Sequence, residues 1–124
     1  MQFIDGGVTA PKGFTANGML CKIKESSTKN DLALVFSEKL CNAAGVFTQN
    51  KVKAESVKLT KENIANGKAQ AVIANSGNAN ACTGEQGAKV ARKMASLAAD
   101  VLGINSGDVI VYSTGVIGKQ LPVE

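Results

Sequence analysis

Apolar positions recur along this chain with helical spacing in one region and in short runs elsewhere. Between residues 84 and 102 the apolar side chains fall on one face of a helix, and they are Val90, Met94, Leu97, Ala98, Val101 and Leu102. Thr83 and Gln86 have the spacing of a capping box at the start, and Gly103 is a typical helix stop. The pattern predicts one long amphipathic helix.

Four short apolar runs bounded by polar or glycine-rich segments predict strands, at residues 13–24, 31–37, 69–74 and 108–113. Asn17-Gly18 is a candidate turn within the first run. The run at 31–37 has the composition of a strand buried on both faces, and we expect it to pair antiparallel with a further apolar run at 43–48. These runs predict a mixed α/β (α+β) protein.

Shorter signals complete the expected order of elements. Thr60 and Gly67 are the candidate N-cap and stop of a short helix. Residues 1–12 are expected to be an extended lead-in, and 26–30 a loop. Leu121-Pro122-Val123-Glu124 is typical of a helix start, and a helix that begins there suggests a piece of a longer protein.

Composition narrows the class of protein. A chain of 124 residues that is 44% hydrophobic and 19% charged predicts a single globular domain. The net charge of +4 is spread over the chain with one Arg and few aromatics, which favours a solvated surface over a nucleic-acid interface. No long apolar segment predicts a signal peptide or membrane span. We therefore expect neither nucleic acid nor membrane as partner.

Reactive residue types are few. The chain has no histidine, so it cannot form a Ser-His-Asp triad or a Cys-His pair by itself. Three cysteines without a CxxC motif favour neither a metal site nor a disulfide framework, and they fit a reducing cytoplasm. No P-loop or dinucleotide fingerprint is present. We expect no metal and no bound cofactor.

Two strand ends carry the residues that could form a site. Ser113-Thr114-Gly115 follows a buried strand, and there the Thr114 hydroxyl and the Gly115 N–H could stabilise a developing negative charge; the alternative is that these residues only turn the chain. The second end is residues 75–84, Asn-Ser-Gly-Asn-Ala-Asn-Ala-Cys-Thr-Gly. Its amides could bind a substrate carboxylate or carbonyl, or could satisfy backbone groups in a tight strand–helix connection.

The segments 75–84, 113–118 and Gly6–Phe14 together resemble the ornithine acetyltransferase family, also called glutamate N-acetyltransferase or ArgJ. Residues 31–34 and 45–48 fit the same pattern, so the resemblance covers essentially the whole chain. The long Asn-rich motif is far more specific than a lone glycine pattern. The resemblance implies a layered α/β sandwich related to the aminopeptidase DmpA, with a mixed sheet, stacked sheets and packed helices, incomplete in a piece of this length.

The resemblance also implies a mechanism. Family members cut themselves before a threonine, and this new N-terminal Thr of a β chain carries the acetyl group from N-acetylornithine to glutamate. Some members also use acetyl-CoA. Thr114 and Gly115 match the family's oxyanion-stabilising pair, while the nucleophile lies beyond position 124. The expectations are a cytoplasmic (αβ)2 heterotetramer for the intact enzyme and an inactive N-terminal part, residues 1–124, on its own.

Two other classes of function stay open at this point. Open sheet edges could make the chain a protein-binding or small-ligand-binding module. A nonspecific nucleic-acid binder is supported only by the positive charge.

Overall fold

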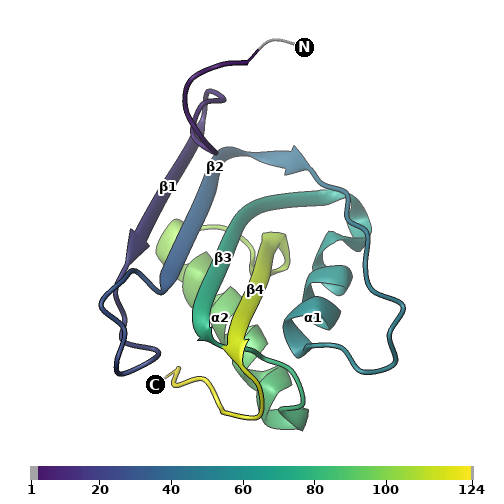
Figure 1. Cartoon of the computed structure of the whole chain (residues 1–124). Coiled ribbons are helices and arrows are strands. Elements are labelled where there is room, and N and C mark those ends of the chain that lie inside the picture. Colours follow the sequence, from purple (N-terminus) through teal and green to yellow (C-terminus); the bar gives the residue numbers. More distant parts are fainter. Residues whose placement is uncertain (1–2, 124) are drawn as a thin grey trace.

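The computed structural model describes residues 3–123, and within them four strands form one mixed sheet (Figure 1). The strands are β1 (Phe14–Met19), β2 (Leu32–Asn42), β3 (Lys68–Asn78) and β4 (Val109–Val116), and they lie in the order β1-β2-β3-β4. The pairs β1/β2 and β2/β3 are antiparallel, whereas β3/β4 is parallel. A parallel pair needs a crossover connection, and helix α2 (Gly84–Leu102) provides it.

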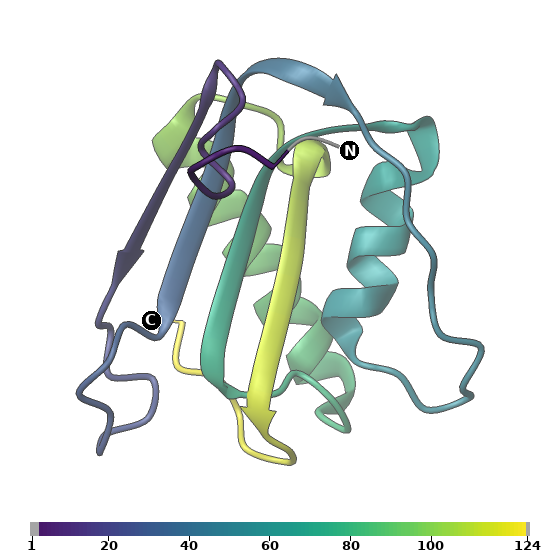
Figure 2. The ribbon, with the colours of Figure 1, turned by 45° about the horizontal axis from the view of Figure 1, so that its top comes forward.

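Helix α2 builds the core from small side chains. Its buried residues include Ala91, Ala95 and Ala98, which lie against Val109 and Val111 of β4. Alanines let the helix approach the sheet closely, so few aromatics are needed. The helix runs diagonally behind the sheet in both views (Figures 1 and 2). No helix of the described residues covers the opposite face.

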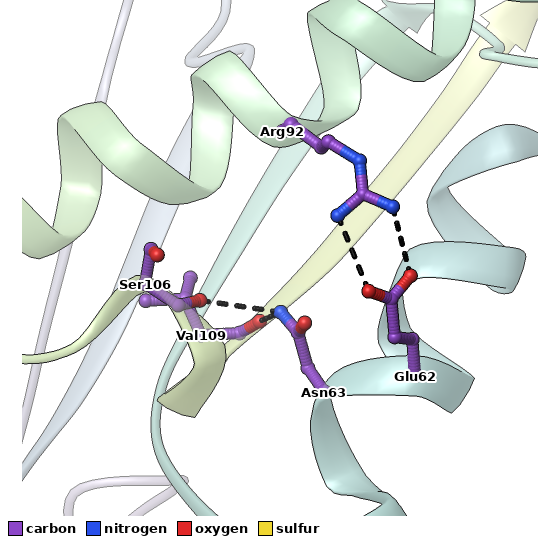
Figure 3. Close-up of polar contacts among 5 residues, drawn as sticks. All are labelled: Glu62, Asn63, Arg92, Ser106 and Val109. Carbon is purple, nitrogen blue, oxygen red and sulfur yellow. Dashed lines mark hydrogen bonds and ion pairs between the residues drawn. The ribbon is translucent and has the colours of Figure 1, made fainter.

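Helix α1 (Glu55–Asn63) lies beside β4 and covers the outer edge of that strand. The Thr60 hydroxyl accepts a hydrogen bond from the Val111 N–H at 3.1 Å and donates one to the Val111 carbonyl at 2.9 Å. Asn63 Nδ2 donates to the carbonyls of Val109 and Ser106, at 2.8 and 3.2 Å (Figure 3). Side chains of α1 thus take the place of a fifth strand, and β1 remains the open edge.

An exposed ion pair joins α1 to α2. Arg92 Nη2 lies 2.9 Å from Glu62 Oε2, and Nη1 lies 3.3 Å from Oε1 (Figure 3). The hydrogen bond and the charge of Glu62 raise the pKa of Arg92. Because both side chains are more than half exposed, solvent screening keeps the stabilisation small.

The predicted sheet and long helix are confirmed, and several local predictions are wrong. Residues 43–48 form no strand, because both edges of β2 are already occupied by β1 and β3. Asn17-Gly18 is not a turn but part of β1, paired with Leu34 and Ala33. Strand β2 is only partly buried, because one face of the sheet carries no helix.

The ends of the helices also differ from prediction. Helix α1 begins at Glu55, not at Thr60, because the carbonyl of Asn80 accepts the Glu55 N–H from far along the chain. Thr83 is the N-cap of α2, but its hydroxyl makes no cap hydrogen bond and donates to Asn80 Oδ1 at 2.6 Å instead. Gly67 and Gly103 end their helices with φ of 74° and 67°, as predicted.

Two predictions about the C-terminal half of the chain are wrong, one about buried side chains and one about a helix. Leu97 and Val101 of α2 are 43% and 82% exposed, although their spacing predicted a core position. Residues 121–123 are not helical, and Glu124 lies outside the described residues. None of the helices within residues 3–123 combines the length and apolar character that a membrane crossing requires.

Candidate functional site

The parallel strands β3 and β4 end side by side, which brings both predicted site segments to one edge of the sheet. Their register pairs Ser76 with Thr114 and Gly77 with Gly115. Carboxyl ends of parallel strands are a common place for ligand sites. The structure therefore brings the two segments together, and the contacts of each decide what it can do.

Thr114 and Gly115 lie on the surface at the end of β4. Since side chains alternate along a strand and Val109 and Val111 face the helices, Thr114 points to the face of the sheet that no described helix covers. The Thr114 hydroxyl makes no hydrogen bond with any of residues 3–123. It is free to donate one to a ligand.

Gly115 is fixed by a close approach of the two strands. Its φ is 132°, a conformation that L side chains rarely adopt, and a Cβ there would overlap the backbone of Gly77. Gly77 itself has φ of 135°. The backbone around Thr114 is therefore held in one position by two glycines in direct contact.

The Asn-rich segment is used inside the protein. Asn75, Asn78 and Asn80 are 2–4% exposed. Asn80 Nδ2 donates to the Gly87 carbonyl at 2.9 Å, and its backbone carbonyl accepts the Glu55 N–H at 2.8 Å. These contacts fix the starts of both helices.

Asn78 holds the segment that follows β4. Its Nδ2 donates to the carbonyls of Gln120 at 2.8 Å and Lys119 at 3.4 Å, while the Ala79 N–H donates to the Val116 carbonyl at 2.9 Å. Of the two alternatives for residues 75–84, the structure supports the one in which their amides satisfy a tight connection. Asn75 is a partial exception, since its Nδ2 donates to the Asn78 carbonyl but its buried Oδ1 has no partner among the described residues.

Other reactive groups do not gather near this edge. Cys82 is exposed, with φ of 57°. Within the part of the chain that the structure describes, no three His, Cys, Asp or Glu side chains lie where they could hold a metal ion. What the site offers is a hydroxyl and backbone groups, which suits stabilisation of an oxyanion better than attack on a substrate.

Comparison with known proteins identifies the family of the chain. The model of the ArgJ family matches residues 15–124. The chain belongs to the ArgJ family. It is 54% identical to the arginine biosynthesis bifunctional protein ArgJ of Caldanaerobacter subterraneus subsp. tengcongensis and 54% identical to that of Symbiobacterium thermophilum, in each case over 100% of this chain. It spans 30% and 31% of the lengths of these ArgJ proteins.

Solved ArgJ structures share the fold. The crystal structure of ArgJ from Bacillus halodurans matches with a TM-score of 0.90 and 44% identity, over 95% of this chain and 61% of that one. Ornithine acetyltransferase from Mycobacterium tuberculosis, solved in complex with ornithine, matches with a TM-score of 0.90 and 46% identity, over 94% of this chain and 63% of that one. The mixed sheet with packed helices is thus an ArgJ fold.

Proposed function

We propose that this chain is the N-terminal part of an ornithine acetyltransferase and supplies the oxyanion-stabilising groups of its active site. The reaction moves an acetyl group from N-acetylornithine to glutamate through an acetyl-threonine. The observation that supports this most directly is the exposed Thr114-Gly115 pair at the end of β4, with a hydroxyl that no described residue engages.

The chemistry follows from the rigidity of that strand end. When a threonine attacks the acetyl carbonyl, negative charge develops on the carbonyl oxygen. The Thr114 hydroxyl and the Gly115 N–H donate hydrogen bonds to this oxygen. The contact between Gly115 and Gly77 fixes these donors before the reaction begins, so little reorganisation is needed as the charge forms.

The nucleophile and its base come from outside residues 1–124. A chain without histidine cannot activate a hydroxyl by the usual imidazole. An N-terminal threonine solves this problem because its own α-amino group accepts the proton. The proposed partner is therefore a β chain cut from the same precursor, in a cytoplasmic (αβ)2 heterotetramer that takes N-acetylornithine and glutamate. Residues 1–124 alone are inactive.

The uncovered face of the sheet supports a further layer built by that partner polypeptide. Strand alternation and register place Val35, Val72 and Ile110 in one row across this face, with Tyr112 in the next. Tyr112 is 57% exposed. An apolar face of this kind is expected to pack against a second sheet in the complete protein.

The experiment uses a polypeptide of the relatives' full length that begins with residues 1–124, because the nucleophile is required. We expect Thr114→Ala to lower kcat for acetyl transfer from N-acetylornithine to glutamate by roughly 10²–10³-fold, the usual effect of losing one oxyanion donor. Thr114→Ser keeps the hydroxyl and should retain most of the rate. The thermal unfolding midpoint should stay within a few degrees in both.

Thr15→Ala is the matched control, since Thr15 is an exposed strand residue on β1, away from the β3 and β4 ends. It should leave kcat unchanged. A Thr114→Ala enzyme that turns over at more than half the normal rate would remove Thr114 from the mechanism.

A further inference from the structure

A groove of about 610 Å³ opens between the β1–β2 half of the sheet and the C-terminal half of α2. It arises because α2 crosses the sheet diagonally, so that the helix packs on β3 and β4 but stands away from β1 and β2 (Figure 2). The groove lies on the helix-covered face of the sheet, opposite the face of Thr114. It is a separate surface from the proposed active site.

The walls of the groove are apolar and partly exposed. Leu97 and Val101 of α2 face Met19, Leu32 and Leu34 of the sheet across it. Met19 is 57% exposed and Val101 is 82% exposed. Large apolar side chains on two facing walls mark an interaction surface rather than isolated surface residues.

One end of the groove already holds polypeptide. After β4 the chain turns back beneath the sheet (Figure 1). Leu121, Pro122 and Val123 line the groove. Leu121 is 9% exposed and belongs to the core. An apolar segment of the chain therefore fits this surface.

We propose that the rest of this groove binds the segment that follows position 124 in a polypeptide of the ArgJ relatives' length, through an apolar stripe on that segment. The inference rests on the proposed function, in which residues 1–124 are the N-terminal part of the protein. The solved relatives supply the length: this chain covers 61–63% of two ArgJ chains at a TM-score of 0.90, so each continues well beyond the matched fold.

Asn75 is a buried polar residue in the wall of the groove. Its side chain lines the groove, and its buried Oδ1 has no hydrogen-bond partner within residues 3–123. A buried acceptor without a donor is costly, so native structures rarely leave one.

The first test needs no substitution, because the chain carries its own probe and control. Cys21 is exposed and lines the groove, whereas Cys82 is exposed and does not. In the full-length polypeptide, iodoacetamide labelling followed by peptide mass spectrometry should show Cys21 reacting at least about tenfold more slowly than Cys82, after each rate is divided by that in urea. Equal normalised rates would overturn the proposal.

The second test identifies the occupant. A photo-crosslinking benzoylphenylalanine placed at Val101 of the full-length polypeptide should crosslink to a peptide from beyond position 124 of the same molecule. The same probe at Val52, which is 70% exposed and lies outside the groove, should not give that product. A crosslink between two copies, or none, would overturn the proposal.

The two proposals fail separately. A full-length protein that transfers the acetyl group while Cys21 stays fully reactive retains the proposed function and loses the groove occupant. A protein with a protected Cys21 and no transfer activity retains the groove occupant and loses the proposed function.

Discussion

Replacing Gly115 by alanine tests whether the end of β4 is as rigid as the proposed oxyanion site requires. Two features oppose the added methyl group. Its φ of 132° is a region that L residues rarely occupy, and the new Cβ would overlap the backbone of Gly77 on β3. No side-chain rotation relieves a clash with backbone, so the two strands must separate or the backbone must change conformation.

The expected cost is the sum of these effects. The backbone conformation costs about 1–3 kcal/mol for a residue with a Cβ, and overpacking adds about 1–3 kcal/mol. Gly115→Ala should therefore lower the free energy of unfolding by about 2–6 kcal/mol. Gly118→Ala is the matched control, because Gly118 has φ of 82° but open space around its Cβ. It should cost only about 1–2 kcal/mol.

Urea unfolding of both variants, followed by circular dichroism, measures the difference. If Gly115→Ala falls within about 0.5 kcal/mol of Gly118→Ala, a spread typical of ordinary surface substitutions, the strand contact is not tight. The argument that the donors are held in place before reaction would then fail. Amide hydrogen exchange adds a local reading, since a forced separation of β3 and β4 should accelerate exchange at the ends of both strands.

Three further substitutions test the contacts that hold the site in place. Thr60→Val leaves the Val111 N–H and carbonyl without their partner and should cost about 2–4 kcal/mol in urea unfolding, whereas Thr60→Ser should recover most of that loss. Asn78→Leu removes the donor to two carbonyls after β4 and should cost about 1–3 kcal/mol, with faster hydrogen exchange from 119 to 121; unchanged exchange there would contradict its anchoring role. Glu62→Gln should cost less than about 1 kcal/mol because its pair with Arg92 is exposed. Since Glu62 raises the pKa of Arg92, that contribution is fully present below the arginine's ordinary pKa and is lost as the pH rises through the raised pKa. A stability difference that changes across neutral pH would refute this.

The parts of the fold that the sequence predicts well are those set by local signals. The long helix has apolar positions at regular spacing and a glycine that enters the left-handed region at its end, and α2 ends at Gly103 as expected. The strands before the two polar segments are equally clear, because each is a short apolar run followed by small residues. These features depend on neighbours in sequence and need no knowledge of the rest of the chain.

The wrong predictions depend on contacts between distant residues. Helix α1 begins at Glu55 because Asn80 supplies a carbonyl, and nothing near Glu55 in the sequence announces that cap. The apolar run at 43–48 has strand composition but no free strand edge to join. Leu97 and Val101 have core spacing, but the crossing direction of α2 places them over a groove. The local pattern of apolar residues predicts neither the angle at which a helix crosses the sheet nor which strand edges are already paired.

In the candidate site, too, local signals were predicted from the sequence and contacts between distant residues were not. Thr114 and Gly115 follow from the resemblance to the ArgJ family, but the contact between Gly115 and Gly77 is visible only once the two strand ends are paired. The Asn-rich segment attracts attention in the sequence because amides can bind substrates. In the structure its amides donate to carbonyls of the protein itself, and groups that are buried and already bonded cannot also hold a ligand.

The contact between Gly115 and Gly77 and the internal hydrogen bonds of the Asn-rich segment serve the same purpose. An oxyanion site needs donors that do not move, and the immobility must come from somewhere other than the donors. Asn78 and Asn80 hold the connection after β3 and the segment after β4, while Gly77 allows β4 to approach. In the proposed mechanism these buried polar residues support the site, and Thr114, which is small and exposed, is the group that acts. If the support alone mattered, Thr114→Ala would be silent and Asn78→Leu harmful. The proposed mechanism requires Thr114→Ala to abolish most of the rate in a protein whose stability is unchanged.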